Sequence, residues 1–196
     1  MRLETHLTLA MCASAEPELQ AWAARHGVKA LCIELARGVT PRQVMLTLRG
    51  STSVEEARQR AEALAFEARS TCDARPCRIK VETPWTWSPL AEEAPCYLEH
   101  HVRVATRDLE ALARLAASHA AHLSRSAYKV SPDGLQERFL TQRFGPSDDA
   151  AMDVAFGSLL AGLAGAGLPV TKVERERVLF DDNLTLDEGW MEETPR

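Results

Sequence analysis

The residues that most constrain the fold of this chain are 3–9, whose sequence LETHLTL alternates between apolar and polar side chains. A second stretch, residues 98–104 (LEHHVRV), repeats the alternation and again carries glutamate and histidine on its polar side. Because successive side chains of a β-strand point to opposite faces, this period predicts strands with one packed face and one polar face. The fold must therefore accommodate two similar polar faces that carry ionisable groups.

Apolar periodicity divides the remaining chain into helices and strands. Ser53 and Glu56 form a capping box that predicts a helix start, and Gly27 predicts the end of an earlier helix. The run 131–134 (SPDG) predicts a turn between two strands. The predicted strands cover residues 3–11, 28–35, 43–49, 78–83, 97–105, 122–130, 137–144 and 170–180, and the predicted helices cover 16–26, 53–69, 108–121 and 147–165.

Each half of this order reads strand, helix, strand, strand, helix, strand, which is the order of a ferredoxin-like unit. His6 matches His101 and Thr47 matches Thr141 at nearly constant spacing. The repetition predicts an α+β protein that is a tandem duplication of a ferredoxin-like unit, with helices on one face of the antiparallel sheets. The predicted divisions are 1–83 for the first half, 84–96 for a connector whose Trp85 and Trp87 cover a seam, 97–180 for the second half and 181–196 for an acidic tail.

In such a unit the helices cover one sheet face and leave the polar face open. We expect the two polar faces to form a cleft between the halves that binds a small anionic, phosphate-containing ligand. Arginine and histidine suit this task because they donate charge-assisted hydrogen bonds to phosphate oxygens. The candidate residues are His6 and His101 together with Glu4, Thr8, Thr47, Arg49, Glu99, Arg103, Thr141 and Arg143.

Two alternatives require no ligand. The polar faces can be solvated, with cross-strand ion pairs that contribute about 0.2–1 kcal/mol each. They can instead be buried between halves or between subunits, where the charges would have to pair. In that case the chain is a structural or regulatory module that forms a homodimer through its polar face.

The triplet His6-Leu7-Thr8 resembles the His-x-Thr motif of the 2H phosphoesterases, which are also built from two ferredoxin-like lobes. The resemblance implies that His6 and His101 act as general acid and base on a phosphodiester or cyclic phosphate. Arg103 stands where the family has its second threonine, which is a departure from the motif. Tandem units are also similar to the triphosphate-tunnel proteins, but their opening Glu-x-Glu-x-Lys is absent here.

Composition excludes several other classes of protein. The net charge of −5 argues against a protein that binds nucleic acid by neutralising phosphates, and no apolar run reaches the roughly 20 residues of a membrane span. Five cysteines, an odd number without ligand spacing, favour reduced thiols in a cytoplasmic protein. No motif predicts a metal or a cofactor, so the expected partner is a small anion, with a second copy of the chain as the alternative.

Overall fold

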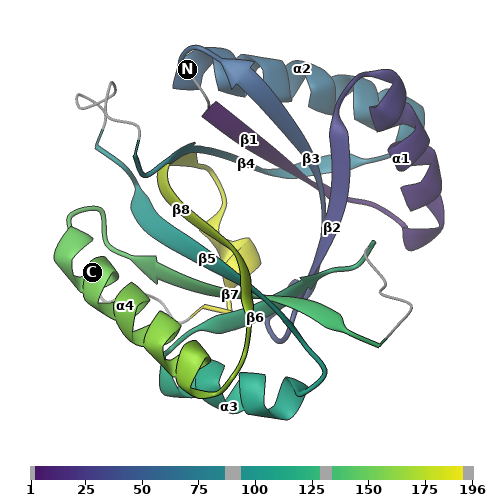
Figure 1. Ribbon diagram of the computed structural model, residues 1–196. Helices are drawn as coiled ribbons and strands as arrows, with labels where there is room; N and C mark the ends of the chain where they lie inside the picture. The colour runs from purple at the N-terminus through teal and green to yellow at the C-terminus, as the bar shows by residue number, and fades with distance from the viewer. Residues whose placement is uncertain (1–2, 87–93, 129–133, 192–196) are drawn as a thin grey trace.

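Eight strands pair edge to edge into one closed antiparallel barrel in the computed structural model, which describes residues 3–86, 94–128 and 134–191 (Figure 1). Around the barrel the order is β1-β3-β2-β6-β7-β5-β8-β4, and β4 pairs with β1 to close the ring. The strands are β1 (Leu3–Ala10), β2 (Lys29–Leu35), β3 (Arg42–Ser51), β4 (Arg75–Pro84), β5 (Tyr97–Thr106), β6 (His122–Ser126), β7 (Gln136–Phe144) and β8 (Val170–Asp181).

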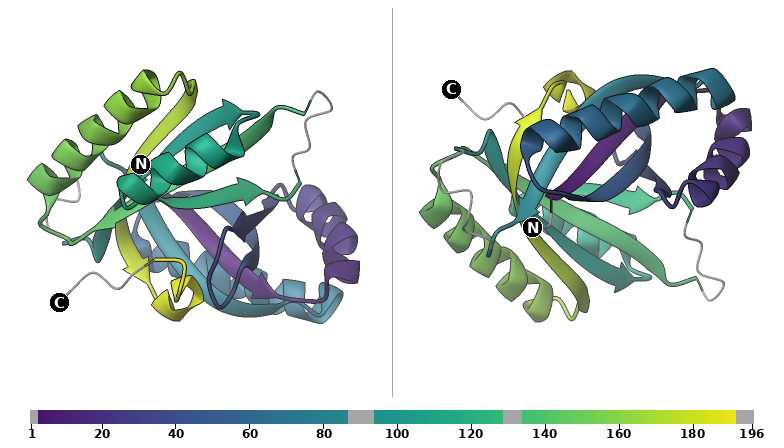
Figure 2. Two further views of the ribbon diagram at one scale, coloured as in Figure 1. Left: turned by 90° about the horizontal axis from the view of Figure 1, so that it is seen from below. Right: turned by 90° about the horizontal axis from the view of Figure 1, so that it is seen from above.

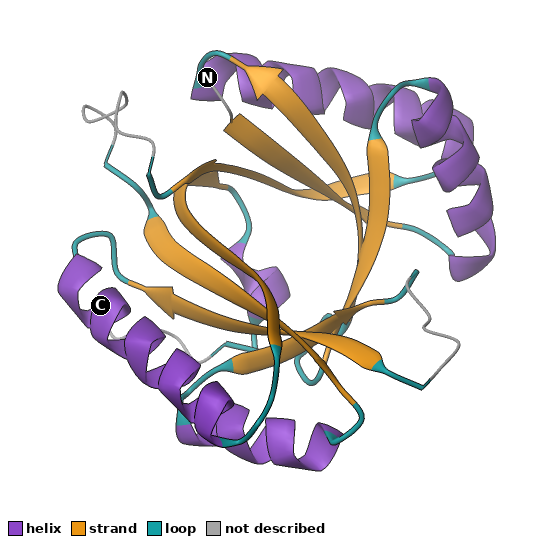
Figure 3. Ribbon diagram, viewed as in Figure 1, coloured by secondary structure: helices purple, strands orange, loops and turns teal. Residues whose placement is uncertain are grey.

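The α-helices lie outside the barrel. In the described part of the chain they are α1 (Glu16–Arg25), α2 (Val54–Cys72), α3 (Leu109–Ser118) and α4 (Asp149–Gly165), with short 3-10 helices η1 (Ala13–Ala15) and η2 (Leu184–Asp187). α1 and α2 cover one side of the barrel, while α3 and α4 cover the opposite side (Figures 2 and 3). None of these helices combines the length and the apolar character that crossing a membrane requires.

Two apolar cores fill the space between the helices and the outer face of the barrel. In the first core, Leu7 and Leu46 are fully buried on the strands beneath α1 and α2. In the second core, Val102 and Leu140 pack in the same way against leucines of α3 and α4, among them Leu159. Burying one such side chain contributes about 1.5–3 kcal/mol. The apolar half of the alternation therefore faces outward, and the polar half faces the barrel interior.

The prediction of a tandem duplication of ferredoxin-like units with open sheets is wrong, because the strands of both halves belong to one barrel. β2 pairs with β6 through Ile33 and Ser126, and β4 pairs with β8 through Val81 and Phe180. An edge strand leaves backbone donors and acceptors unpaired, and pairing the edges of one half with those of the other removes this cost. The order of the elements is as predicted, but their closure into a barrel is not.

The segment that was predicted as an acidic tail covers one end of the barrel. Asp181 is the last residue of β8, and η2 follows it behind the strands in Figure 1. The backbone oxygen of Glu188 accepts a hydrogen bond from Val39 N at 2.9 Å, and Trp190 Nε1 donates to the carbonyl of Leu123 at 3.1 Å. Trp190 also packs in a small apolar cluster with Leu35. Residues 192–196 lie outside the described part.

The predicted connector holds Trp85 where strands of the two halves meet. Trp85 N donates to the carbonyl of Arg175 on β8 at 2.8 Å. The guanidinium groups of Arg175 and Arg177 lie 4.7 Å and 4.5 Å from the centre of its indole. Trp87 and the predicted turn at 131–133 lie outside the described residues.

The buried face of α2 consists of small residues, which allows the helix to lie close to the strands. Ala61 is fully buried there, whereas Ala63 two residues later is exposed. We expect Ala61→Leu to lower the free energy of unfolding by about 1–3 kcal/mol, because the added atoms have no space. Ala63→Leu is the matched control and should change it by less than about 0.5 kcal/mol. Urea unfolding measures both values, and equal effects would contradict the close packing of α2.

Candidate functional site

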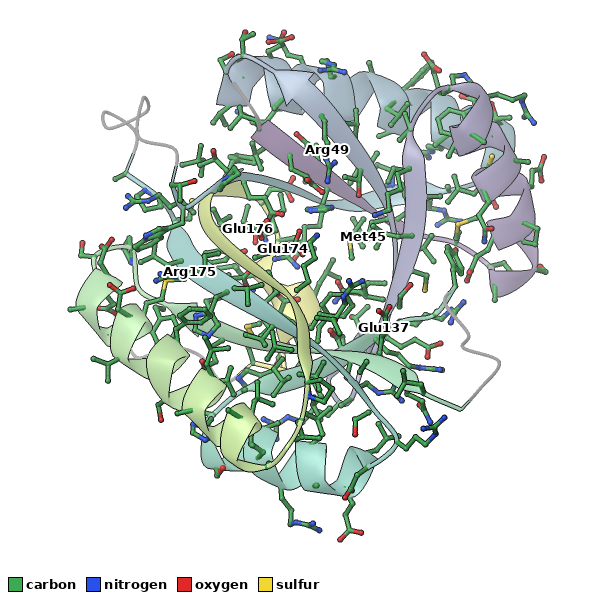
Figure 4. All side chains as sticks on the ribbon, viewed as in Figure 1. Met45, Arg49, Glu137, Glu174, Arg175 and Glu176 are labelled. Carbon is green, nitrogen blue, oxygen red and sulfur yellow. The ribbon has the colours of Figure 1, made fainter. Side chains whose placement is uncertain are left out.

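The polar strand faces enclose a cavity of about 380 Å³ inside the barrel, which we call the lumen. An eight-stranded barrel has an interior just wide enough for packed side chains or for one small ligand. Figure 4 shows Glu174 and Glu176 reaching toward the central opening from β8, and Arg175 between them pointing away. Side chains from all eight strands and from the C-terminal segment line the lumen.

Lys80 joins carboxylates from both halves of the chain at the centre of the lumen wall. Its Nζ lies 2.7 Å from Glu82 Oε2 on β4 and 2.6 Å from Glu99 Oε2 on β5. β4 and β5 are not neighbours, because β8 lies between them. Glu82 and Glu99 are 3% and 2% exposed, so these charges are shielded from water and require each other.

From Glu99 the ion pairs continue to the covered end of the barrel. Arg143 Nη2 lies 2.8 Å from Glu99 Oε1 and 2.6 Å from Asp187 Oδ2. The other oxygen of Asp187 accepts a hydrogen bond from Arg78 Nη1 at 3.0 Å. Asp187 therefore bridges the buried Arg78 and the partly buried Arg143, and it connects the C-terminal segment to the barrel wall.

In the other direction the ion pairs lead to His6. Its Nε2 lies 2.9 Å from Glu82 Oε1 and 3.7 Å from Glu4 Oε1. Its Nδ1 is 3.2 Å from the hydroxyl of Thr47, which is its direct neighbour on β3. Glu4 in turn pairs with Arg49 at 2.7 Å near the exposed rim.

His101 occupies a similar place on β5. Its Nδ1 is 2.8 Å from the hydroxyl of Thr141, its direct neighbour on β7. Its Nε2 lies 3.5 Å from Glu99 and 3.4 Å from Glu176. We call this whole set the ion-pair network: Glu4, His6, Arg49, Arg78, Lys80, Glu82, Glu99, His101, Arg143, Glu176 and Asp187.

The network moves the pKa values of its members away from their ordinary values. Burial lowers the pKa of His101, but the carboxylates of Glu176 and Glu99 outweigh burial and raise it to about 10. Burial likewise lowers the pKa of His6, and Glu82 outweighs it, so that this pKa is also raised. For Glu99, burial raises the pKa, but Lys80 and the neighbouring cations lower it well below the ordinary value. His101 is therefore an imidazolium at neutral pH.

The opposite arc of the lumen carries most of its large apolar side chains, among polar ones such as Gln43 and Ser124. We call five of these apolar side chains the apolar wall: Leu31 and Ile33 of β2, Met45 of β3, Phe139 of β7, and Tyr128. Figure 4 shows Met45 reaching toward the opening from the side opposite Glu174 and Glu176. The lumen therefore has one charged side and one apolar side.

The structure brings all the sequence-predicted site residues together. His6, His101 and seven of the other eight line the lumen, and Thr47 contacts His6 directly. They face one another across a barrel interior rather than across a cleft between two lobes. Their role as ligand contacts stays a prediction.

Sequence reasoning missed several residues of the lumen as site residues. Arg78 stands in the same alternation as Lys80 and Glu82, so the period of β4 could have identified it. Asp187 lies in a segment without strand periodicity and gave no such signal. The apolar wall was also missed, because apolar residues were expected on the packed side alone.

Replacing Asp187 by asparagine tests the network. Arg78 keeps its pair with Asp181 and Arg143 keeps its pair with Glu99, but each loses one buried charged hydrogen bond. We therefore expect Asp187→Asn to lower the free energy of unfolding by about 1–3 kcal/mol. The neighbouring Glu188 is exposed, and Glu188→Gln should leave stability within about 0.5 kcal/mol of wild type. Denaturant unfolding distinguishes the two, and a small effect of Asp187→Asn would show that the pairs contribute little.

The raised pKa of His101 predicts a pH dependence of stability. Because the pKa in the folded protein is about 10 and the ordinary value is 6.5, the stabilisation is complete below pH 6.5 and is lost toward pH 10. We expect the free energy of unfolding to fall by on the order of 2 kcal/mol between about pH 6 and about pH 9. The free energy of unfolding of the His101→Gln variant should fall distinctly less over the same pH interval. Equal slopes for the two proteins would contradict the assignment.

Comparisons with known proteins show no family. No protein-family model matches the chain, and no curated protein matches it. The acetolactate synthase small subunit from Thermotoga maritima is 12% identical, with 93% of this chain and 97% of that chain covered and a TM-score of 0.33. A heme-binding protein from Thermus thermophilus is 11% identical, with 91% of each chain covered and a TM-score of 0.32. Likenesses at these scores carry no argument about function.

Proposed function

We propose that the lumen binds a small organic anion. The observation that carries this proposal is the balance of charge among the side chains that line the lumen. Among the described residues, seven lysines and arginines and two histidines line it, against six carboxylates. Since the pKa of His101 keeps that ring protonated, the lumen retains an excess of positive charge at neutral pH. Such an excess attracts an anion toward the lumen.

Lys29 is the cation best placed to meet the ligand. It lines the lumen from the first position of β2, where it is exposed to solvent, and within the described residues it forms no ion pair. Arg103 is engaged by Glu137 at 3.3 Å, and Arg143 is buried between two carboxylates. An anion that pairs with Lys29 gains a charge-assisted hydrogen bond without breaking an existing ion pair.

Binding is favoured over cleavage of a phosphoester by His6 and His101. Acid–base catalysis on a phosphodiester requires one imidazole to be neutral and to accept a proton. Because the pKa of His101 is raised to about 10, its imidazole is protonated at neutral pH and cannot accept a proton. Both nitrogens of His6 already face Glu82 and the hydroxyl of Thr47.

The polar faces cannot form the dimer interface of the structural alternative. They line the inside of a closed barrel, so a second copy of the chain cannot pack against them. A homodimer that uses another surface stays a prediction.

Removing the charge of Lys29 tests the proposal. We expect Lys29→Gln to weaken the binding of benzoate or inorganic phosphate, whichever binds wild type, by at least about tenfold, because a charged hydrogen bond is lost. Arg114→Gln removes one positive charge from the exposed face of α3 and should leave the dissociation constant unchanged. Isothermal titration calorimetry measures both. The proposal fails if wild type binds neither anion, or if the two variants behave alike.

A further inference from the structure

We infer that the ligand is amphipathic: a carboxylate attached to an apolar body that packs against the apolar wall. This inference rests on the proposed function and specifies the class of anion. The geometry of the lumen divides it into two surfaces of different chemistry. Phosphate or acetate would use only one of them.

Three side chains of the apolar wall, Leu31, Met45 and Phe139, belong to none of the apolar cores, whereas Tyr128 and Ile33 also pack against core clusters. The apolar cores lie on the outer face of the strands, beneath the helices. Leu31 and Phe139 nevertheless point into the lumen, where they are only partly buried. Apolar surface that faces water costs about 25 cal/mol per Å² relative to burial. An apolar body in the lumen would remove this surface from water.

The apolar wall lies on one arc of the barrel, where Ser124 and Ser126 of β6 separate its β2 residues from Phe139 of β7. β3, β2, β6 and β7 follow one another around the barrel, and Leu31 is the direct cross-strand neighbour of Met45. The remaining arc, β5, β8, β4 and β1, carries most of the ion-pair network. A ligand in the lumen therefore contacts an apolar surface on one side and charged groups on the other.

Cations lie at both sides of the apolar wall. Lys29 is two residues before Leu31 on β2, so the two side chains share the lumen face one step apart. Arg103 on β5 is the direct cross-strand neighbour of Phe139 on β7. A carboxylate beside either cation places its attached carbon chain along the wall.

The size of the lumen limits the body. A volume of about 380 Å³ holds about a dozen atoms of the size of a water molecule, each of which occupies about 30 Å³. A carboxylate with roughly six to nine carbons has roughly eight to eleven non-hydrogen atoms once its two oxygens are counted, and it fits this volume. Inorganic phosphate fills less than half of it and leaves the apolar wall hydrated.

Titration of wild type with four probes tests the inference: inorganic phosphate, acetate, hexanoate and 3-phenylpropionate. We expect the two larger carboxylates to bind at least about tenfold more tightly than acetate, since each buried methylene strengthens binding. Hexanol, which has a body of the same length and no charge, should bind at least about tenfold more weakly than hexanoate.

Variants of the wall locate the binding. Met45→Gln should weaken hexanoate at least about fivefold while leaving acetate unchanged, because it replaces an apolar side chain by a polar one of similar length. Leu31→Gln is a second variant of the same kind, on β2, for the case in which Met45→Gln does not fold. Phe66→Gln, on the exposed face of α2, is the control and should change neither value.

The outcomes separate the two proposals. If phosphate or acetate binds as tightly as hexanoate, the amphipathic ligand is overturned, while the anion site stands. If hexanol binds as tightly as hexanoate, the anion site is overturned. If none of the probes binds, both proposals fall.

Discussion

Lys80, held between Glu82 and Glu99, is the interaction on which the interior of this barrel depends. Each of these charges would be costly to bury alone, and breaking such a pair by removing one partner costs about 3–5 kcal/mol. Because Glu82 belongs to β4 and Glu99 to β5, satisfying Lys80 requires both halves of the chain to face the same lumen. The pairing continues through Arg143 and Asp187, so the wall and the segment that covers its end are fixed together.

The distribution of apolar side chains explains how the barrel tolerates charges at its centre. Its main stabilising surfaces lie outside, where α1 and α2 cover one core and α3 and α4 cover another. The strands thus bury their apolar residues toward the helices and leave the lumen to polar groups. The exception is the apolar wall around Leu31 and Met45, and this departure from the pattern underlies the inferred ligand class.

Local periodicity was enough to identify the elements and the residues that share a face. It placed His6 with Thr47 and His101 with Thr141, and these are direct cross-strand neighbours. It could not predict the closed barrel, because alternation fixes which way a side chain points but not which distant edge its strand will pair with. The contacts of Asp187 could not be predicted from the sequence either, because they depend on where an irregular segment lies in space rather than on any repeat.

The position of β8 has a consequence for biosynthesis. It lies between β4 and β5 in the ring, yet it follows every other described strand in the sequence. A nascent chain therefore carries seven strands before the barrel can close. Until then Glu82 and Glu99 are not enclosed, and the edges of β4 and β5 remain open to other chains. The lumen can thus be enclosed only after β8 has been synthesised, and a chain that ends before residue 170 would carry an exposed sheet edge.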